Sequence, residues 1–186
     1  MELNVLPECY VDTKLIKMLV PPRKHYNHQK GTNVLKRMNE ELADEFALGI
    51  VDQDVEDRDY AQAFQVIYEL PGCLKLLKHS HRHHFLIYLC PEVEKWIIAR
   101  AEDAQISLTT YGLPHDFDKL RKISKTSKSE SSDPYSDHFQ RLFRALRQAN
   151  PPSIAILKFW ITYLKDNPYQ VDLSQLIQET EQLIHG

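Results

Sequence analysis

The chain has few cysteines, and their positions exclude two kinds of site. Of its 186 residues only three are cysteine, namely Cys9, Cys73 and Cys90, an odd number at wide spacing. This pattern matches neither a disulfide framework nor the paired CxxC spacing of a structural zinc site. Free thiols are typical of a reducing compartment, so we expect a cytoplasmic protein.

Signals for secretion, membranes and several enzyme classes are also missing. The stretch MELNVLPECY has no basic segment followed by an apolar one, so no secretory signal is expected. No apolar run approaches the roughly 18 residues of a membrane-spanning helix. The P-loop, GxGxxG, GxSxG and HExxH motifs are absent, which argues against nucleotide kinases, dinucleotide enzymes, serine hydrolases and zincins.

The chain has no strong excess of charge of either sign. Its 23 Lys and Arg residues and 26 Asp and Glu residues give a net charge of -3, and 42% of the residues are hydrophobic. These values are typical of a globular protein, and the length suits one domain with an appendage. The net charge provides no general attraction to nucleic acid, which would need a local basic patch.

Alternating apolar runs and amphipathic stretches predict an α/β core over residues 1–105. Strands are predicted at residues 3–8, 46–51, 73–79 and 84–90, with a histidine-rich turn between the last two. Helices are predicted at residues 12–20, where Asp12 or Thr13 would be the cap, and at 32–46, 60–70 and 91–104. Helices between strands favour a mostly parallel sheet flanked by helices.

Residues 106–186 predict a helical extension. Segment 124–137, SKTSKSESSDPYSD, contains six serines and no aliphatic residue, which predicts a mobile loop. Beyond it, residues 138–149, 153–165 and 173–184 have the apolar spacing of three helices. We expect these helices to pack on the sheet.

Acidic residues follow three of the predicted strands. Glu8 ends the first strand, Asp52 and Asp54 follow the second, and Glu92 or Glu94 follows the strand at 84–90. The carboxyl ends of parallel strands meet at one edge of the sheet, where α/β proteins bind ligands. Carboxylates about 7 Å apart repel by about 2–3 kcal/mol per pair, so a cluster would favour Mg²⁺ or Mn²⁺, ions that support phosphoryl transfer. The alternative is that these residues cap the following helix in a solvated loop.

This arrangement resembles the Toprim fold, the catalytic domain shared by topoisomerases, primases, overcoming-lysogenization-defect nucleases and RloB-like phage-defence proteins. Those families have a glutamate after the first strand, like Glu8 in VLPECYVDTKLIKMLV, and a DxD pair after a later strand, like Asp52 and Asp54 in GIVDQD. The small stand-alone RloB-like proteins also have a P-x-x-E-x-W-L segment, to which LCPEVEKWII, containing Glu94, is similar. Cys9 stands where those proteins usually have a glycine.

The resemblance covers residues 3–100 and implies a fold, a cofactor and an activity. It implies a Toprim-like core in which Asp52, Asp54 and Glu94 hold Mg²⁺ and Glu8 is a ligand or a general acid or base. The implied activity is that of a Mg²⁺-dependent nuclease, or a related phosphotransfer enzyme, acting on nucleic acid in phage defence. The alternative is a non-catalytic regulatory or protein-interaction module with the same fold.

Basic residues indicate two regions that contact nucleic acid. Lys14, His25 and Lys30 lie near the first acidic motif and are candidates for phosphate contacts. Arg141 and Arg144, followed by Arg147, recur every three residues and would form one helical stripe, with Lys119, Arg121, Lys122 and Lys125 upstream. A solvated helix face is the alternative.

The histidines of KHSHRHH form a separate candidate site. On a strand, His79, His81 and His83 would share a face, with His84 beside them, and three imidazoles on one face suit zinc or another transition metal. An exposed hairpin whose histidines titrate near neutral pH is the alternative interpretation.

Overall fold

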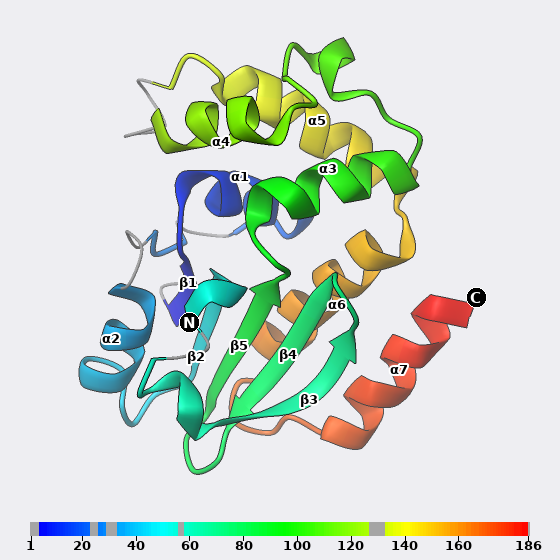
Figure 1. Cartoon of the computed structure of the whole chain (residues 1–186). Helices are drawn as coiled ribbons and strands as arrows, with labels where there is room; N and C mark the ends of the chain where they lie inside the picture. The colour runs from blue at the N-terminus through cyan, green and yellow to red at the C-terminus, as the bar shows by residue number, and fades with distance from the viewer. Residues whose placement is uncertain (1–3, 23–25, 29–32, 56–57, 127–132, 186) are drawn as a thin grey trace.

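A five-stranded mixed sheet forms the centre of the protein, shown in Figure 1 as a computed structural model that describes residues 4–22, 26–28, 33–55, 58–126 and 133–185. Its strands are β1 (Val5–Pro7), β2 (Ala47–Asp52), β3 (Phe64–Leu70), β4 (Leu74–His79) and β5 (His84–Leu89), in the spatial order β1-β2-β5-β4-β3. β1, β2 and β5 are parallel, whereas β4 and β3 are antiparallel to their neighbours. The predicted α/β class is confirmed, and the predicted parallel character holds for three strands.

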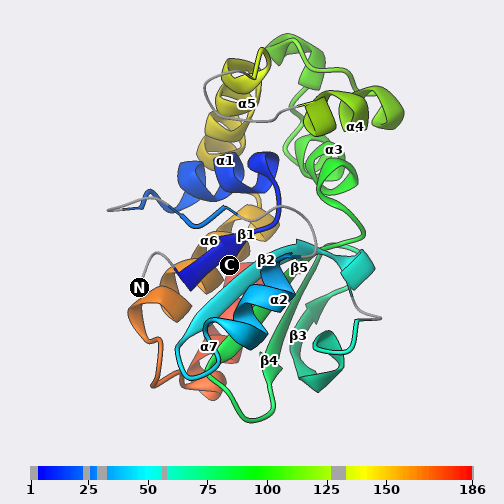
Figure 2. The ribbon, with the colours of Figure 1, turned by 90° about the vertical axis from the view of Figure 1, so that its left-hand side faces the viewer.

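Helices cover both faces of the sheet and one of its ends. They are α1 (Tyr10–Leu19), α2 (Asn33–Glu40), α3 (Val93–Asp103), α4 (Phe117–Thr126), α5 (Ser136–Ala149), α6 (Pro152–Asp166) and α7 (Leu173–His185). Figures 1 and 2 show α2 on one face of the sheet and α6 and α7 on the other. Helices α1, α3, α4 and α5 lie above the carboxyl ends of the parallel strands (Figure 1). None of the described helices is long and apolar enough to span a membrane.

Strand β5 divides the core between the two faces of the sheet. Phe85, Ile87 and Leu89 belong to the larger apolar cluster, which also contains residues of α1, α3, α5, α6 and α7. The intervening Leu86 and Tyr88 belong to the smaller cluster beneath α2. This alternation is the period of two that a strand imposes on its side chains, and here both faces of the strand are buried.

The helical extension shares the larger core with the sheet. The expected helices at 138–149, 153–165 and 173–184 are present as α5, α6 and α7. Trp160 of α6 is fully buried, its ring centroid lies 6.1 Å from that of Tyr68 on β3, and its Nε1 donates a 2.8 Å hydrogen bond to Thr180 Oγ1 on α7. The tail therefore packs directly on the sheet. Within the expected loop at 124–137, residues 127–132 lie outside the described residues.

The helix predicted over residues 60–70 is wrong, because most of that segment forms strand β3. Its aromatic and β-branched residues suit a strand, and the following Pro-Gly pair closes a hairpin. Cys73 N donates a 2.9 Å hydrogen bond to Leu70 O, and Gly72 has a φ of 66°, which glycine adopts without strain. This hairpin makes β3 and β4 antiparallel.

Candidate active site

The first two acidic segments meet at the carboxyl end of β1 and β2. Glu8 follows β1 directly, and its N–H donates a 3.0 Å hydrogen bond to Ile50 O, which extends the parallel pairing by one residue. The Glu8 carboxylate then accepts a 3.1 Å hydrogen bond at Oε2 from the backbone N–H of Asp52. The predicted convergence of these two strand ends is present in the structure.

The third acidic segment joins them through the start of α3. Asp52 Oδ1 accepts a 2.8 Å hydrogen bond from Val93 N, the first helical residue of α3. An anionic group is favourable there, because the N-terminus of a helix presents free N–H groups and a partial positive charge. Glu94, in the same turn, is 5% exposed and accepts a hydrogen bond from Ser124 Oγ on α4. Asp52 therefore caps a helix, as the alternative interpretation expected, but this helix is α3, which follows β5 and not β2.

A further carboxylate, Asp12, was missed as a site residue because the sequence suggested it only as a helix cap. It is the third residue of α1, where its Oδ2 accepts a 2.9 Å hydrogen bond from Cys9 N and its N–H donates to Cys9 Sγ. The residue is 1% exposed, and its Oδ1 has no hydrogen-bond partner among the described residues. Asp12 lies four residues after Glu8, so the short connection from β1 into α1 keeps the two close along the chain, but only the packing of α1 brings Asp12 to the pocket.

These acidic side chains line one pocket of about 660 Å³. Its lining includes six carboxylates, from Glu8, Asp12, Asp52, Asp54, Glu92 and Glu94, together with Arg121, Ser124 and Lys125 of α4. Asp54 is exposed and lies in a 3₁₀ turn, Gln53–Val55, so the strand does not continue past Asp52. Asp54 nevertheless reaches the pocket, at its outer edge.

Burial and mutual repulsion raise the pKa values of the inner carboxyl groups. Loss of solvent, followed by the charges of Asp12, Glu8 and Glu94, raises the pKa of Asp52 to about 9. Loss of solvent raises the pKa of Asp12 to about 8, with added repulsion from Glu8 and Glu94. Burial also raises the pKa of Glu8, against the opposing effect of its hydrogen bond from Asp52 N. Glu8, Asp12 and Asp52 therefore favour bound protons or a bound cation.

The chemistry of these donors fits a divalent cation. Within the described ranges, no three His, Cys, Asp or Glu side chains are arranged as a finished metal-binding set. The available donors are carboxylate oxygens, which hard cations such as Mg²⁺ and Mn²⁺ prefer. Asp12 Oδ1 in addition is a buried acceptor without a partner, an arrangement that costs free energy unless a proton or cation relieves it.

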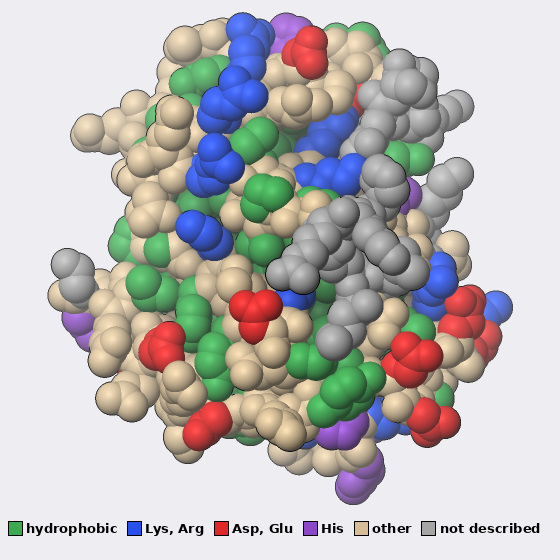
Figure 3. Space-filling model, turned by 180° about the vertical axis from the view of Figure 1, so that it is seen from behind, with side chains coloured by type: hydrophobic (Ala, Val, Ile, Leu, Met, Phe, Trp, Pro, Cys, Tyr) green, Lys and Arg blue, Asp and Glu red, His purple; other side chains and the backbone are tan. Residues whose placement is uncertain are grey.

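The predicted nucleic-acid residues that the structure describes, Lys14, Arg141 and Arg144, do not line this pocket. Lys14 is 4% exposed and forms a buried ion pair with Asp133, so it offers no free charge to a phosphate. His25 and Lys30 lie outside the described residues. Arg141 and Arg144 are exposed on α5 but do not line the pocket. Figure 3 shows Lys and Arg side chains in a line over the upper part of the rear face.

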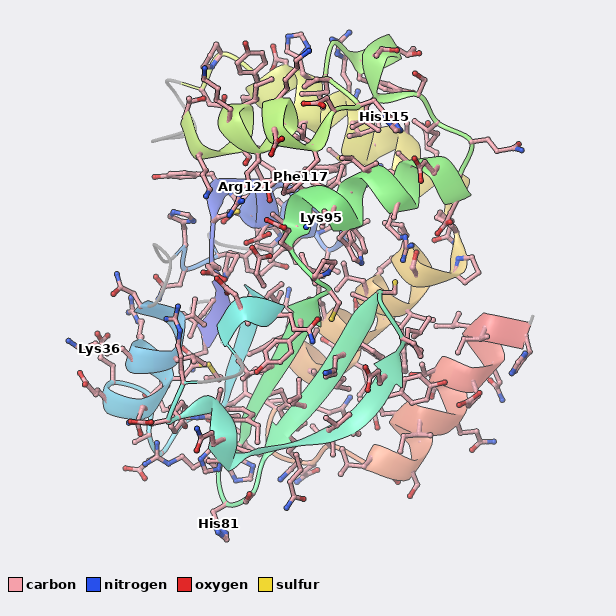
Figure 4. All side chains as sticks on the ribbon, in the orientation of Figure 1. Lys36, His81, Lys95, His115, Phe117 and Arg121 are labelled. Atoms are coloured by element: carbon pink, nitrogen blue, oxygen red, sulfur yellow. The ribbon has the colours of Figure 1, made fainter. Side chains whose placement is uncertain are left out.

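The histidines form the end of the β4–β5 hairpin. His79 and His84 are buried, whereas His81 and His83 are exposed (Figure 4 labels His81). His79 Nδ1 accepts hydrogen bonds from the N–H groups of His81 and Arg82, and both ring nitrogens of His84 are engaged, by Tyr60 Oη and Leu42 O. These bonds favour a hairpin over a metal site, but burial lowers the pKa values of His79 and His84, so the expected exposure and titration near neutral pH do not hold for these two.

Comparisons with known proteins leave the family of this chain undetermined. No family model, curated protein or solved structure matched it. The resemblance to Toprim proteins therefore stays a prediction from the sequence, and the function must be argued from the pocket itself.

Proposed function

We propose that the protein is a divalent-metal-dependent phosphotransfer enzyme of Toprim type that cleaves phosphodiester bonds in nucleic acid. The observation that carries the proposal is the convergence of Glu8, Asp12, Asp52 and Glu94 from three distant segments on one pocket at the carboxyl ends of parallel strands. That edge is the usual ligand site of α/β sheets.

The energetics of the cluster favour a ligand over a purely structural role. Asp52 is satisfied in part as a helix cap, but the charges of Glu8, Asp12 and Glu94 all raise its pKa. Burial raises the pKa values of Asp12 and Asp52 most, and the carboxylates of Glu8 and Glu94 raise both further. A structural cluster would be more stable with amides or apolar residues in these places, since unpaired buried charge is costly.

In this proposal Asp52, Asp54, Glu94 and Glu8 hold Mg²⁺ or Mn²⁺, and Asp12 is added to them through its unpartnered Oδ1. When bound, such an ion supplies an activated water and stabilises the charge that develops on a phosphoryl group. Where Glu8 acts as the general acid or base instead of a ligand, Oε1 is the atom that would take a proton from the attacking water or give one to the leaving oxygen, because Oε2 already accepts the Asp52 N–H.

The test is cleavage of labelled single-stranded and double-stranded DNA and RNA with Mg²⁺ or Mn²⁺. We expect metal-dependent cleavage by the wild type and its loss in Asp52→Asn by at least about 10–100-fold, the effect that even outer partners of metal ligands show. Asp44→Asn is the matched control, because Asp44 is exposed at the opposite end of β2. Equal cleavage by Asp52→Asn and the wild type, or no metal binding in calorimetry, would overturn the proposal.

A further inference from the structure

One side of the pocket is formed by a helix of the extension. Arg121, Ser124 and Lys125 of α4 all line it, and their spacing of three and four residues places them on a single face of that helix. Ser124 contacts the acidic cluster directly, through its hydrogen bond to Glu94. The face of α4 that carries two cations is thus fixed beside the carboxylates.

Lys95, Arg121 and Lys125 form a basic rim beside the pocket. A shared carboxylate and an aromatic ring hold the first two of these cations in place. Glu92 accepts Lys95 Nζ at 2.9 Å and Arg121 Nε at 3.5 Å, and the same two cations lie 4.5 Å and 5.7 Å from the centroid of the Phe117 ring. Figure 4 shows Lys95, Phe117 and Arg121 together between α3 and α4. The Lys95 and Arg121 side chains remain 49% and 45% exposed, so their charges still face solvent.

The rim carries more positive charge than its ion pairs neutralise. Lys95, Arg121 and Lys125 carry three positive charges, and Glu92 carries one negative charge. Lys125 is exposed and has no ion pair within the described part of the chain. Lys95 and Arg121 share the single carboxylate of Glu92, and Lys125 is exposed beside them. The excess positive charge of the rim is therefore available to an anion outside the protein.

We propose that Arg121 and Lys125, supported by Lys95, bind the backbone phosphates of a nucleic-acid strand next to the phosphate that enters the pocket. This inference rests on the proposed function and names the surface on which the substrate lies. A chain with a net charge of -3 has no general attraction for a polyanion, so a local group of cations beside the reaction site is needed to bring the strand there. Arg121 suits this position, because its planar guanidinium can contact a phosphate through two N–H groups.

The test measures binding separately from cleavage. The affinity of a fluorescein-labelled single-stranded oligonucleotide is measured by anisotropy over a series of salt concentrations, with chelator present so that no cleavage occurs. Each phosphate contact on a single strand contributes a slope of about -0.7 to log K against log salt. The double variant Arg121→Gln/Lys125→Gln should therefore bind more weakly and lose about 1.4 of that slope.

The matched control is Lys36→Gln, because Lys36 is exposed on α2, away from the pocket, as Figure 4 shows. It should keep the wild-type affinity and slope. A double variant that is folded by circular dichroism and keeps the wild-type salt slope overturns this inference, whatever the cleavage assay shows. If instead the slope falls as expected but the wild type neither binds metal nor cleaves, the rim is a nucleic-acid site and only the proposed enzymatic function fails.

Discussion

Replacement of Asp12 by asparagine should make the metal-free protein more stable at pH 8. Asp12 is buried in α1, and burial with the charges of Glu8 and Glu94 raises its pKa to about 8. The unfolded chain has the ordinary value of 3.8. Between those values the folded state keeps a proton that the unfolded state has lost, so stability falls as the pH rises. Asparagine keeps an acceptor for Cys9 N–H and removes the ionisation.

The size of the effect follows from the proton count. One proton held by the folded state alone gives a slope of about 1.4 kcal/mol per pH unit. Between pH 6.5 and 8 the Asp12 proton would therefore cost the wild type up to about 2 kcal/mol, which in a chain of this size lowers the melting temperature by about 4–8 °C. Asp52, whose pKa is raised to about 9, adds a change of the same sign. The variant also relieves the repulsion on Asp52, so its curve should be flatter still.

Calorimetric melting in chelator at pH 6.5, 7.2 and 8 measures this difference, with Asp44→Asn as the control. At the lower end of this window the unfolded chain still protonates about half of His79 and His84, whose ordinary pKa is 6.5, but the wild type and Asp12→Asn share this effect, so the difference between their slopes reports Asp12. Divalent metal should then stabilise the wild type most at pH 8, by about 2.7 kcal/mol at a concentration 100 times its Kd. A wild-type melting temperature that is constant or rises from pH 6.5 to 8, or an equal slope in Asp12→Asn, would refute the reasoning.

Three further substitutions test a close contact within the sheet and two buried ionisable side chains. Gly49→Ala should destabilise by about 1–3 kcal/mol in denaturant unfolding, because the new Cβ would lie 2.6 Å from Leu86 Cδ2; an unchanged midpoint would contradict this close approach. Burial lowers the pKa of His79 to about 4, so the stability that neutral His79 contributes is present above pH 6.5 and lost toward pH 4. The melting temperature of His79→Asn should therefore fall less on acidification than that of the wild type, and an equal fall would contradict this role of His79. Lys14→Met should cost about 3–5 kcal/mol by removing the buried cation that pairs with the Asp133 carboxylate, and Lys14→Met/Asp133→Leu should recover part of it if the ion pair is the cause.

The sequence predicted those elements whose apolar pattern has one clear period. Strand β2, strand β5 and helices α5, α6 and α7 were predicted close to their observed positions, because long runs or repeats of three and four residues leave little ambiguity, whereas α4 was not predicted. The segment at 60–70 was ambiguous by period, and tertiary pairing with β4 decides its form. Reading Pro71-Gly72 as a hairpin turn would have predicted the strand, and with it the antiparallel half of the sheet.

The candidate site was predicted where it depends on strand ends and missed where it depends on packing. Glu8, Asp52 and Glu94 follow directly from the rule that parallel strands end at one edge. Asp12 and Arg121 come from helices, and only the way α1 and α4 pack over that edge brings them to the pocket. The ion pair of Lys14 with Asp133 joins residues 119 positions apart, which no local pattern indicates.

The position of α6 and α7 against the sheet has a consequence for the order of synthesis. These two helices follow every strand along the chain and supply part of the apolar cover of one face of the sheet. Until residues 152–185 have left the ribosome, that part of the face is open to water. The carboxylates of Glu8, Asp52 and Glu94 are therefore synthesised before the packing that completes the sheet beneath their pocket.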